Sequence, residues 1–217
     1  MELSVATFAN WVAKTANQLV HGLDRSAGDR AVLLLPLHWQ TAVVAMGCWS
    51  AGLEVVAAGG SADVTFTAID RLAEARATGA EEIVALALAP LGGSLPVVPA
   101  GVTDYGAEVL GYADSFAPAA PIAPAAAALD GRSGAELAGE AAAGALRWDL
   151  SAGDRVLTVA PYDTQDDWLV GLLIPLAVGG GVVLCRHPDP ARLAGRVAAE
   201  RVTATAGIDV EGVRRLL

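Results

Sequence analysis

Apolar residues fall along the first part of the chain in blocks whose spacing predicts alternating helices and strands. An amphipathic helix is predicted over 7–23, with Thr7 as its N-cap, because Phe8, Trp11 and Leu19 recur at helical spacing. Apolar runs over 31–35, 53–57, 64–67 and 82–88 predict strands, and helices are predicted over 40–52 and 70–77. This alternation predicts an α/β fold with mostly parallel sheets covered by helices.

The last third of the chain shows the same kind of pattern. An Ala-rich helix is predicted over 133–146, with Leu137 and Leu146 on its buried face. Strands are predicted over 156–160 and 182–185 and near Ala204, with an apolar helix that ends near Val178. The intervening segment 90–124 is rich in Gly, Pro and Ala, and most of it is not assigned to any element.

A repeated pentapeptide relates the two ends of the chain. Ser-Ala-Gly-Asp-Arg occurs at 26–30 and at 151–155, and each copy is followed by a strand and then by Pro36 or Pro161 at the same distance. A helix, a glycine-containing end and a Val-rich strand complete both units, which predicts two repeat-related βα lobes. We expect a single α/β domain over 1–217, with lobe one at 1–115, lobe two at 130–217 and a connection between them. The alternative is that Gly-Asp-Arg is simply a common turn before a buried strand.

Charge and composition exclude several classes of protein. The formal net charge of −10 offers no basic surface to a nucleic acid. The uncharged stretch 31–53 is interrupted by Pro36 and by polar residues, so we expect buried elements and no membrane span. The N-terminus lacks the pattern of a signal peptide, which favours a cytoplasmic location. Cys48 and Cys185 lie in apolar runs without CxxC spacing and are expected to be buried thiols.

Two long runs resemble the N-terminal region of adenylate-forming enzymes, the superfamily of acyl-CoA synthetases, adenylation domains and luciferases. The run over 150–184, LSAGDRVLTVAPYDTQDDWLVGLLIPLAVGGGVVL, and the run over 187–208 resemble the stretch that follows the phosphate-binding loop of these ligases. Residues 7–20 and 27–56 are similar to their opening helix and first βα unit. The resemblance implies the ligase fold and an ancestral reaction that forms an acyl or aminoacyl adenylate.

The sequence departs from that family at the residues that handle ATP. The resemblance implies a loop of the pattern Thr-Ser-Gly-Thr-Thr-Gly-x-Pro-Lys before the helix at 133–146, but residues 121–134 contain one Ser, no Thr and no Lys. Gly131, Ser133 and Gly134 could offer backbone N–H groups to an anion, or could simply cap the helix. The adenine-binding and ribose-binding segments and the C-terminal domain of the ligases have no counterpart in these 217 residues. We therefore expect no catalytic residues, no cofactor and no metal site.

One polar cluster remains as a candidate ligand site. It follows a predicted buried strand and consists of Tyr162, Asp163, Asp166, Asp167 and Trp168. Open α/β sheets place ligands at such positions, and in the resembled ligases the corresponding loop lines the acyl or amino-acid pocket. The alternative is structural, because Asp163 can start a turn and the two later aspartates favour a helix N-terminus. The matching residues of the first lobe, His38 to Gln40, have the same two interpretations.

Three hypotheses about function follow. The first is a non-catalytic scaffold or interaction protein with a protein partner or a second copy of itself. The second is a module that binds a small acyl or amine ligand. The third is an AMP-forming acyl or aminoacyl ligase that is completed by a separate chain.

Overall fold

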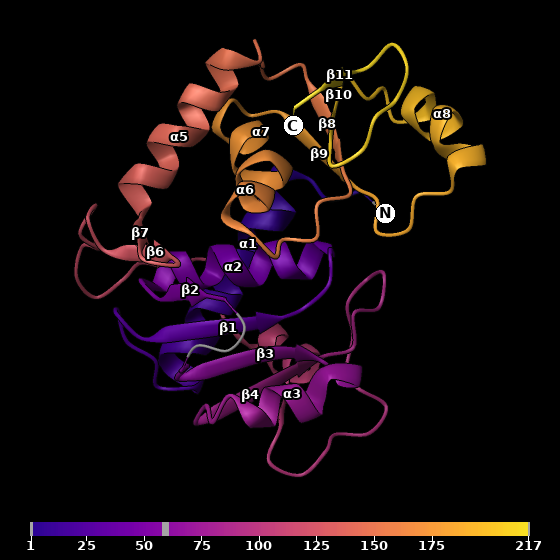
Figure 1. Cartoon of the computed structure of the whole chain (residues 1–217). Coiled ribbons are helices and arrows are strands. Elements are labelled where there is room, and N and C mark those ends of the chain that lie inside the picture. Colours follow the sequence, from indigo (N-terminus) through magenta and orange to yellow (C-terminus); the bar gives the residue numbers. More distant parts are fainter. Residues whose placement is uncertain (1, 58–60, 217) are drawn as a thin grey trace. The chain divides into compact units, whose positions relative to one another are not determined.

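The computed structural model describes residues 2–57 and 61–216 of the chain. The chain folds into two compact units, Met1–Gly134 and Ala135–Leu217. The fold is α/β in both units, with mostly parallel sheets that helices accompany (Figure 1). No helix in the described ranges is both long and apolar enough to cross a membrane.

The first unit is built on a seven-stranded sheet in the order β5-β4-β3-β1-β2-β6-β7. Its strands are β1 (Arg30–Leu34), β2 (Glu54–Val56), β3 (Val64–Ala68), β4 (Glu82–Leu86), β5 (Thr103–Asp104), β6 (Ala127–Leu129) and β7 (Arg132–Ser133). All neighbouring pairs are parallel except β6 and β7, which form an antiparallel hairpin. The predicted strands at the start of the chain are therefore confirmed, and they run parallel as expected.

The helical segments of this unit are α1 (Val5–Asn17), the π-helical η1 (Gln18–Gly22), α2 (Trp39–Ala51), the short 3-10 turn η2 (Ile69–Arg71), α3 (Leu72–Ala77), α4 (Tyr105–Glu108) and η3 (Val109–Gly111). The predicted N-cap Thr7 is wrong. Helix α1 begins one turn earlier, because the Ser4 hydroxyl accepts a hydrogen bond of 3.1 Å from the Thr7 backbone N–H. Helix α2 ends as predicted at Gly52, whose φ of 83° is the left-handed conformation that glycine adopts at helix ends.

The Pro- and Gly-rich middle of the chain contributes β5, α4 and η3 to the first unit. Asp104 fixes its course, because one carboxylate oxygen accepts from Leu95 N at 2.8 Å and the other from Gly106 N at 3.0 Å. Tyr105 is fully buried beside Phe66, and its hydroxyl lies 2.8 Å from the Thr15 hydroxyl. A short Asp-Tyr sequence therefore anchors a segment whose composition alone indicated only a connection.

The second unit is built on a four-stranded parallel sheet in the order β11-β10-β8-β9. Its elements are α5 (Gly134–Arg147), β8 (Arg155–Thr158), α6 (Gln165–Trp168), the π-helical η4 (Leu169–Leu173), α7 (Ile174–Ala177), β9 (Gly181–Leu184), α8 (Pro190–Ala199), β10 (Ala204–Ala206) and β11 (Arg214–Arg215). One core cluster joins the buried side of α5 to Val156, Leu169 and Ala204, and a second lies around Leu157 and Leu193.

Helix α5 corrects one prediction about the core. Leu137 is buried as expected, but Leu146 is 83% exposed. Nine residues correspond to about 2.5 helical turns, so these two side chains point to opposite sides of the helix. The buried side carries Leu137, Ala141, Gly144 and Ala145, which do follow helical spacing.

The two units share one arrangement around the repeated pentapeptide. The strand that follows it is central in both, in β3-β1-β2 and in β10-β8-β9. Ser26 N donates to Asp29 Oδ2 at 2.9 Å, and Ser151 N donates to Asp154 Oδ2 at 2.8 Å. The lobes are thus repeat-related in topology, and the turn before the central strand has the same hydrogen bond in both.

Candidate functional site

The predicted polar cluster follows β8 and consists of two buried rings and three carboxylates that are exposed or half-buried. Tyr162 and Trp168 are both buried, and their rings stack with centroids 4.2 Å apart and planes inclined by 10°. Tyr162 has a φ of 66°, a left-handed conformation that is costly for a bulky residue. Burial raises the pKa of the Tyr162 hydroxyl, which stays protonated at neutral pH.

The carboxylates of the cluster start the following helix. Thr164 is the N-cap of α6 and forms a capping box, in which its hydroxyl accepts from Asp167 N at 3.2 Å and Asp167 Oδ2 accepts from Thr164 N at 3.0 Å. Asp167 also accepts from Asp163 N at 3.2 Å. The side chains of Asp163 and Asp166 are exposed. The described residues contain no group of His, Cys, Asp or Glu suited to a metal ion.

Topology gives this loop a position where α/β proteins often bind ligands. The chain passes from β8 to β9 on one side and then crosses to β10 on the other, so the order of strands reverses beside β8. Ligands of open α/β sheets bind at the carboxyl ends of the strands at such a reversal. At this position the loop has a buried aromatic pair on a strained backbone, the exposed residues Asp163 and Asp166, and Asp167 engaged in the helix cap.

The first-lobe counterpart occupies the equivalent position after β1. His38 is the N-cap of α2, and its Nδ1 accepts from Gln40 N at 3.3 Å. Trp39 donates through Nε1 to Pro90 O at 3.1 Å and meets Trp11 edge to face, with ring centroids 5.1 Å apart. The structure therefore gives His38 a capping role, and it puts Trp39 and Gln40 beside residues from α1 and from the loop after β4.

At the position of the ligase phosphate loop, the chain forms a closed hairpin. Leu129 of β6 pairs with Arg132 of β7, which leaves only Asp130 and Gly131 in the turn. Their φ values of 45° and 81° are those of a type I′ turn, for which Asp-Gly is a preferred sequence. A loop of two residues cannot wrap a chain of phosphates as a nine-residue loop can.

The backbone N–H groups around this hairpin are engaged by the protein itself. Gly131 N donates to Glu54 Oε1 at 2.6 Å, and Gly134 N donates to Ala126 O at 3.2 Å. Asp130 Oδ1 in turn accepts from Ala57 N at 2.7 Å. Of the three N–H groups that could have met an anion, those of Gly131 and Gly134 are used, and two carboxylates lie beside the turn.

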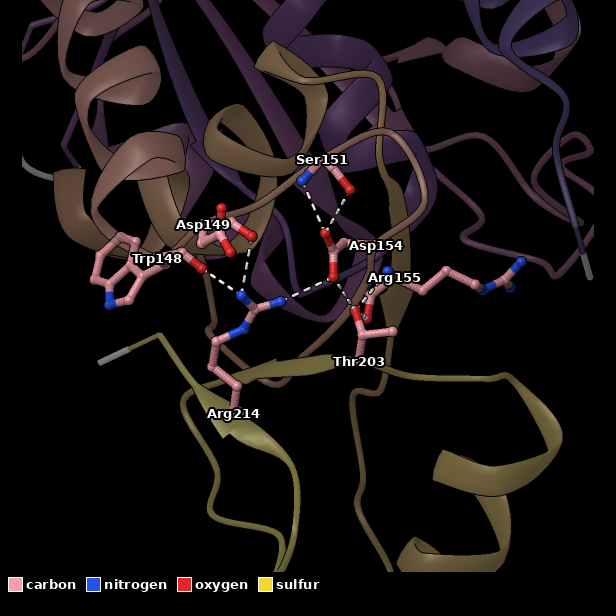
Figure 2. Close-up of polar contacts among 7 residues, drawn as sticks. All are labelled: Trp148, Asp149, Ser151, Asp154, Arg155, Thr203 and Arg214. Carbon is pink, nitrogen blue, oxygen red and sulfur yellow. Dashed lines mark hydrogen bonds and ion pairs between the residues drawn. The ribbon is translucent and has the colours of Figure 1, made fainter.

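A second polar cluster, which the sequence did not reveal, surrounds Asp154 at the amino end of β8 (Figure 2). Its carboxylate accepts from Thr203 Oγ1 at 2.7 Å, from Arg214 Nη2 at 2.8 Å and from both donors of Ser151. The Thr203 hydrogen bond, with those of Ser151 and the charge of Arg214, lowers the pKa of Asp154. The pentapeptide repeat signalled Ser151 and Asp154, but nothing local marked Thr203 or Arg214, which are 49 and 60 residues away along the chain.

The first unit also carries an open apolar groove between α1 and α2. Its volume is about 460 Å³, within the range of small-molecule sites. Its lining includes Phe8, Val12, Met46 and Phe116 and no charged residue. Cys48 is fully buried in α2, and burial raises the pKa of its thiol, while Cys185 is buried in the second unit.

Comparison with known proteins gives one relative by sequence. No model of a known protein family matches the chain. The chain is 40% identical over 208 residues to a Mycobacterium tuberculosis (strain H37Rv) protein described as a TIGR03089 family protein, and the match covers 94% of this chain and 84% of that one.

Comparison with solved structures gives acyl-CoA-forming ligases. The fold is similar to that of an acyl-CoA synthetase of Brucella canis, with a TM-score of 0.77, 16% identity and 95% of this chain covered. It is similar to MatB of Rhodopseudomonas palustris, with a TM-score of 0.78, 17% identity and 96% covered. A benzoate CoA ligase of Burkholderia xenovorans gives a TM-score of 0.75, 15% identity and 94% covered. The chain spans 42%, 44% and 45% of these proteins respectively, less than half of each. At such identities the likeness establishes the fold, that of the N-terminal region of adenylate-forming enzymes.

Proposed function

The chain belongs to the TIGR03089 family, and from its ligase-like fold and its closed hairpin we propose that it forms no adenylate on its own and acts as a scaffold or interaction protein. The observation that carries this proposal is the two-residue turn Asp130-Gly131 at the place of the ligase phosphate loop. Transfer of an adenylyl group builds negative charge that cationic groups and Mg²⁺ must stabilise. Beside this turn lie the carboxylates of Asp130 and of Glu54 from β2, and the one cationic residue of the hairpin itself is Arg132.

The pairing of two of the chain's cations also supports the proposal. Lys14, the one lysine of the chain, forms an ion pair of 3.0 Å with Asp114, and its ammonium group donates to two backbone carbonyls. Arg30 Nε lies 3.7 Å from Glu54, so its charge already has a partner. These cations serve the protein's own carboxylates and carbonyls.

An interaction role is supported by apolar surface. Val5 of α1 is 84% exposed near the start of the helix whose side lines the apolar groove. Leu91 and Val97 are 79% and 77% exposed. The apolar groove and these exposed side chains are the features of the first unit that an apolar partner surface could contact.

Two assays test the proposal. ATP–pyrophosphate exchange with a panel of carboxylic acids and amino acids should give no signal above buffer. Light scattering and crosslinking should detect an assembly or a partner, and Val12→Glu, which places a charge in the groove, should weaken it. Exchange catalysed by the chain itself would refute the first half of the proposal. A monodisperse monomer with no recoverable partner would refute the second.

Ligand binding at the loop after β8 is a second candidate, favoured by the strained φ of 66° at Tyr162 beside the reversal of strand order. An acyl or amine ligand would meet Tyr162 and Trp168, with Asp163, Asp166 or Asp167 toward an amine. Unchanged binding of such a ligand after Asp166→Ala and Asp167→Ala would argue against a role for these carboxylates. The third candidate, a ligase completed by a separate chain, is compatible with a length under half that of the solved ligases. It predicts pyrophosphate exchange only when that second chain is added.

A further inference from the structure

The carboxyl end of β1 in the first unit has the same topological property as the loop after β8. The chain leaves β1 for β2 on one side and then crosses to β3 on the other, so the order of strands reverses between β1 and β3. Helix α2, thirteen residues long, starts at this point. The position is one where α/β sheets bind ligands, and the proposed scaffold role makes no use of it.

Gln40, in the first turn of α2, carries an unmet hydrogen-bonding requirement at this position. The residue is 1% exposed, and its Oε1 is buried with no partner among the described residues. A buried carbonyl without a partner loses its hydration and gains nothing in return. Leucine or methionine would fill the same space without that cost, so the choice of glutamine needs a reason.

A short loop after β4 links the Gln40 amide to two indole rings. A Cβ added to Gly92 would lie 3.4 Å from Trp11 Cη2 and 3.7 Å from Gln40 Nε2, so this glycine lies against both side chains. Trp11 meets Trp39 edge to face, and Trp39 is tied to the loop through Pro90 O. Both indoles are half-buried. The loop bears Leu88 and Gly92 at φ values of 53° and 79°, and Leu91 at its tip is largely exposed.

We propose that Gln40, Trp11 and Trp39 form a recognition site for a small planar ligand whose ring carries a carboxamide or a similar donor–acceptor group. The ring contacts the indoles, and the polar group pairs with the Gln40 amide, which supplies both a donor and an acceptor. The loop around Gly92 covers the site when it is empty. A ligand enters when that loop shifts away from Trp11.

The first test compares the wild-type chain with Gln40→Met, which keeps the volume and the helix propensity and removes the amide. If the amide is kept for a ligand, Gln40→Met raises the thermal midpoint of the unliganded chain by about 2–4 °C, because an unpaired polar group is removed. If the amide supports the fold, the midpoint falls, and the proposal is overturned.

The second test uses benzamide as the probe and the indole N–H signals in NMR as the readout, assigned with Trp11→Phe and Trp39→Phe. Benzamide should shift the signals of Trp11 and Trp39 and leave that of Trp148 unmoved. Binding to Gln40→Met should be at least about tenfold weaker. Absence of shifts in the wild-type chain overturns the proposal. So do equal shifts by toluene, which has the ring but no polar group.

A pair of glycine variants keeps the test independent of Gln40. Gly92→Ala and Gly101→Ala place a side chain on backbones of similar φ, 79° and 70°, but only the first adds a methyl beside Trp11 and Gln40. Gly92→Ala should change the benzamide shifts of Trp11, because the added methyl alters how the loop lies against this indole, and Gly101→Ala should leave them as in the wild-type chain. Equal behaviour of the two variants contradicts the location proposed for the site.

Discussion

Replacing Asp154 by Asn tests how the second unit holds its C-terminal segment. The change preserves the shape of the side chain but removes the charge that Arg214 and Thr203 bind at 2.8 Å and 2.7 Å. The new amide group would also face the N–H of Ser151, donor against donor. Arg214 would keep its hydrogen bonds to the carbonyls of Trp148 and Asp149.

The expected loss is about 2–3 kcal/mol of unfolding free energy, because hydrogen bonds to charged groups contribute about 1.5–3 kcal/mol. The repeat supplies a matched control in Asp29→Asn. Asp29 accepts the same serine N–H, but its nearest guanidinium, that of Arg25, is 4.0 Å away. A loose ion pair at the surface contributes under about 1 kcal/mol, so this variant should lose about 1 kcal/mol.

The pH dependence carries a definite sign. The pKa of Asp154 is lower in the folded state than its ordinary value, first because of Thr203 and then because of Ser151 and Arg214. Its contribution is therefore present above about pH 4 and is lost as the pH falls through the folded-state pKa. The difference between wild-type and Asp154→Asn should shrink over that range.

Urea unfolding followed by far-UV circular dichroism, which reports the helices of both units, at pH 7 and in steps to pH 3, measures both effects. A loss for Asp154→Asn no larger than that for Asp29→Asn, or a difference that stays constant down to pH 3, would refute the reasoning.

Three further predictions follow from burial and capping. Leu137→Ala should lower the free energy of unfolding, measured with denaturant, by about 2–5 kcal/mol, because its side chain is buried. Leu146→Ala should change it by under about 0.5 kcal/mol, because that side chain is exposed. Equal losses would contradict the orientation of α5. In thermal unfolding, Asp167→Ala should lower the free energy of unfolding by about 1 kcal/mol because it breaks the capping box, and Asp166→Ala should leave it nearly unchanged. The reverse order would mean that α6 is capped differently. Cys48 and Cys185 should react with a thiol reagent only after denaturant is added, since both are buried; rapid labelling of the native chain would contradict this.

Much of the fold was readable from the sequence because apolar spacing fixes which segments become buried elements. The strands at 31–35 and 156–160 were found within two residues of their ends, since each is a short apolar run after a turn. The pentapeptide repeat indicated related lobes from its spacing alone. The prediction for Leu146 was wrong because it followed the hydrophobicity of the residue alone. The helical repeat of about 3.6 residues places Leu146 on the side opposite to Leu137.

The site was less readable, because its decisive features depend on interactions between distant residues. The sequence showed that residues 121–134 lack the ligase pattern, but the two-residue turn depends on the pairing of Leu129 with Arg132. Likewise, the Tyr162–Trp168 stack and the partners of Asp154 arise only in the folded chain. The capping role of Asp167 was one of the two interpretations that spacing allowed, and its role toward a ligand stays a prediction.

Thermal unfolding of the whole chain with and without millimolar Mg-ATP tests the central claim most directly, with Mg²⁺ and sulfate at matched ionic strength as the control. Nucleotide at 100 times its Kd would stabilise a one-site binder by about 2.7 kcal/mol, a shift of roughly 5–10 °C for a chain of this length. We predict no shift beyond the control, because the Asp130-Gly131 turn is closed and bordered by carboxylates. A clear shift with Mg-ATP would mean that the chain binds the nucleotide, and it would contradict the account.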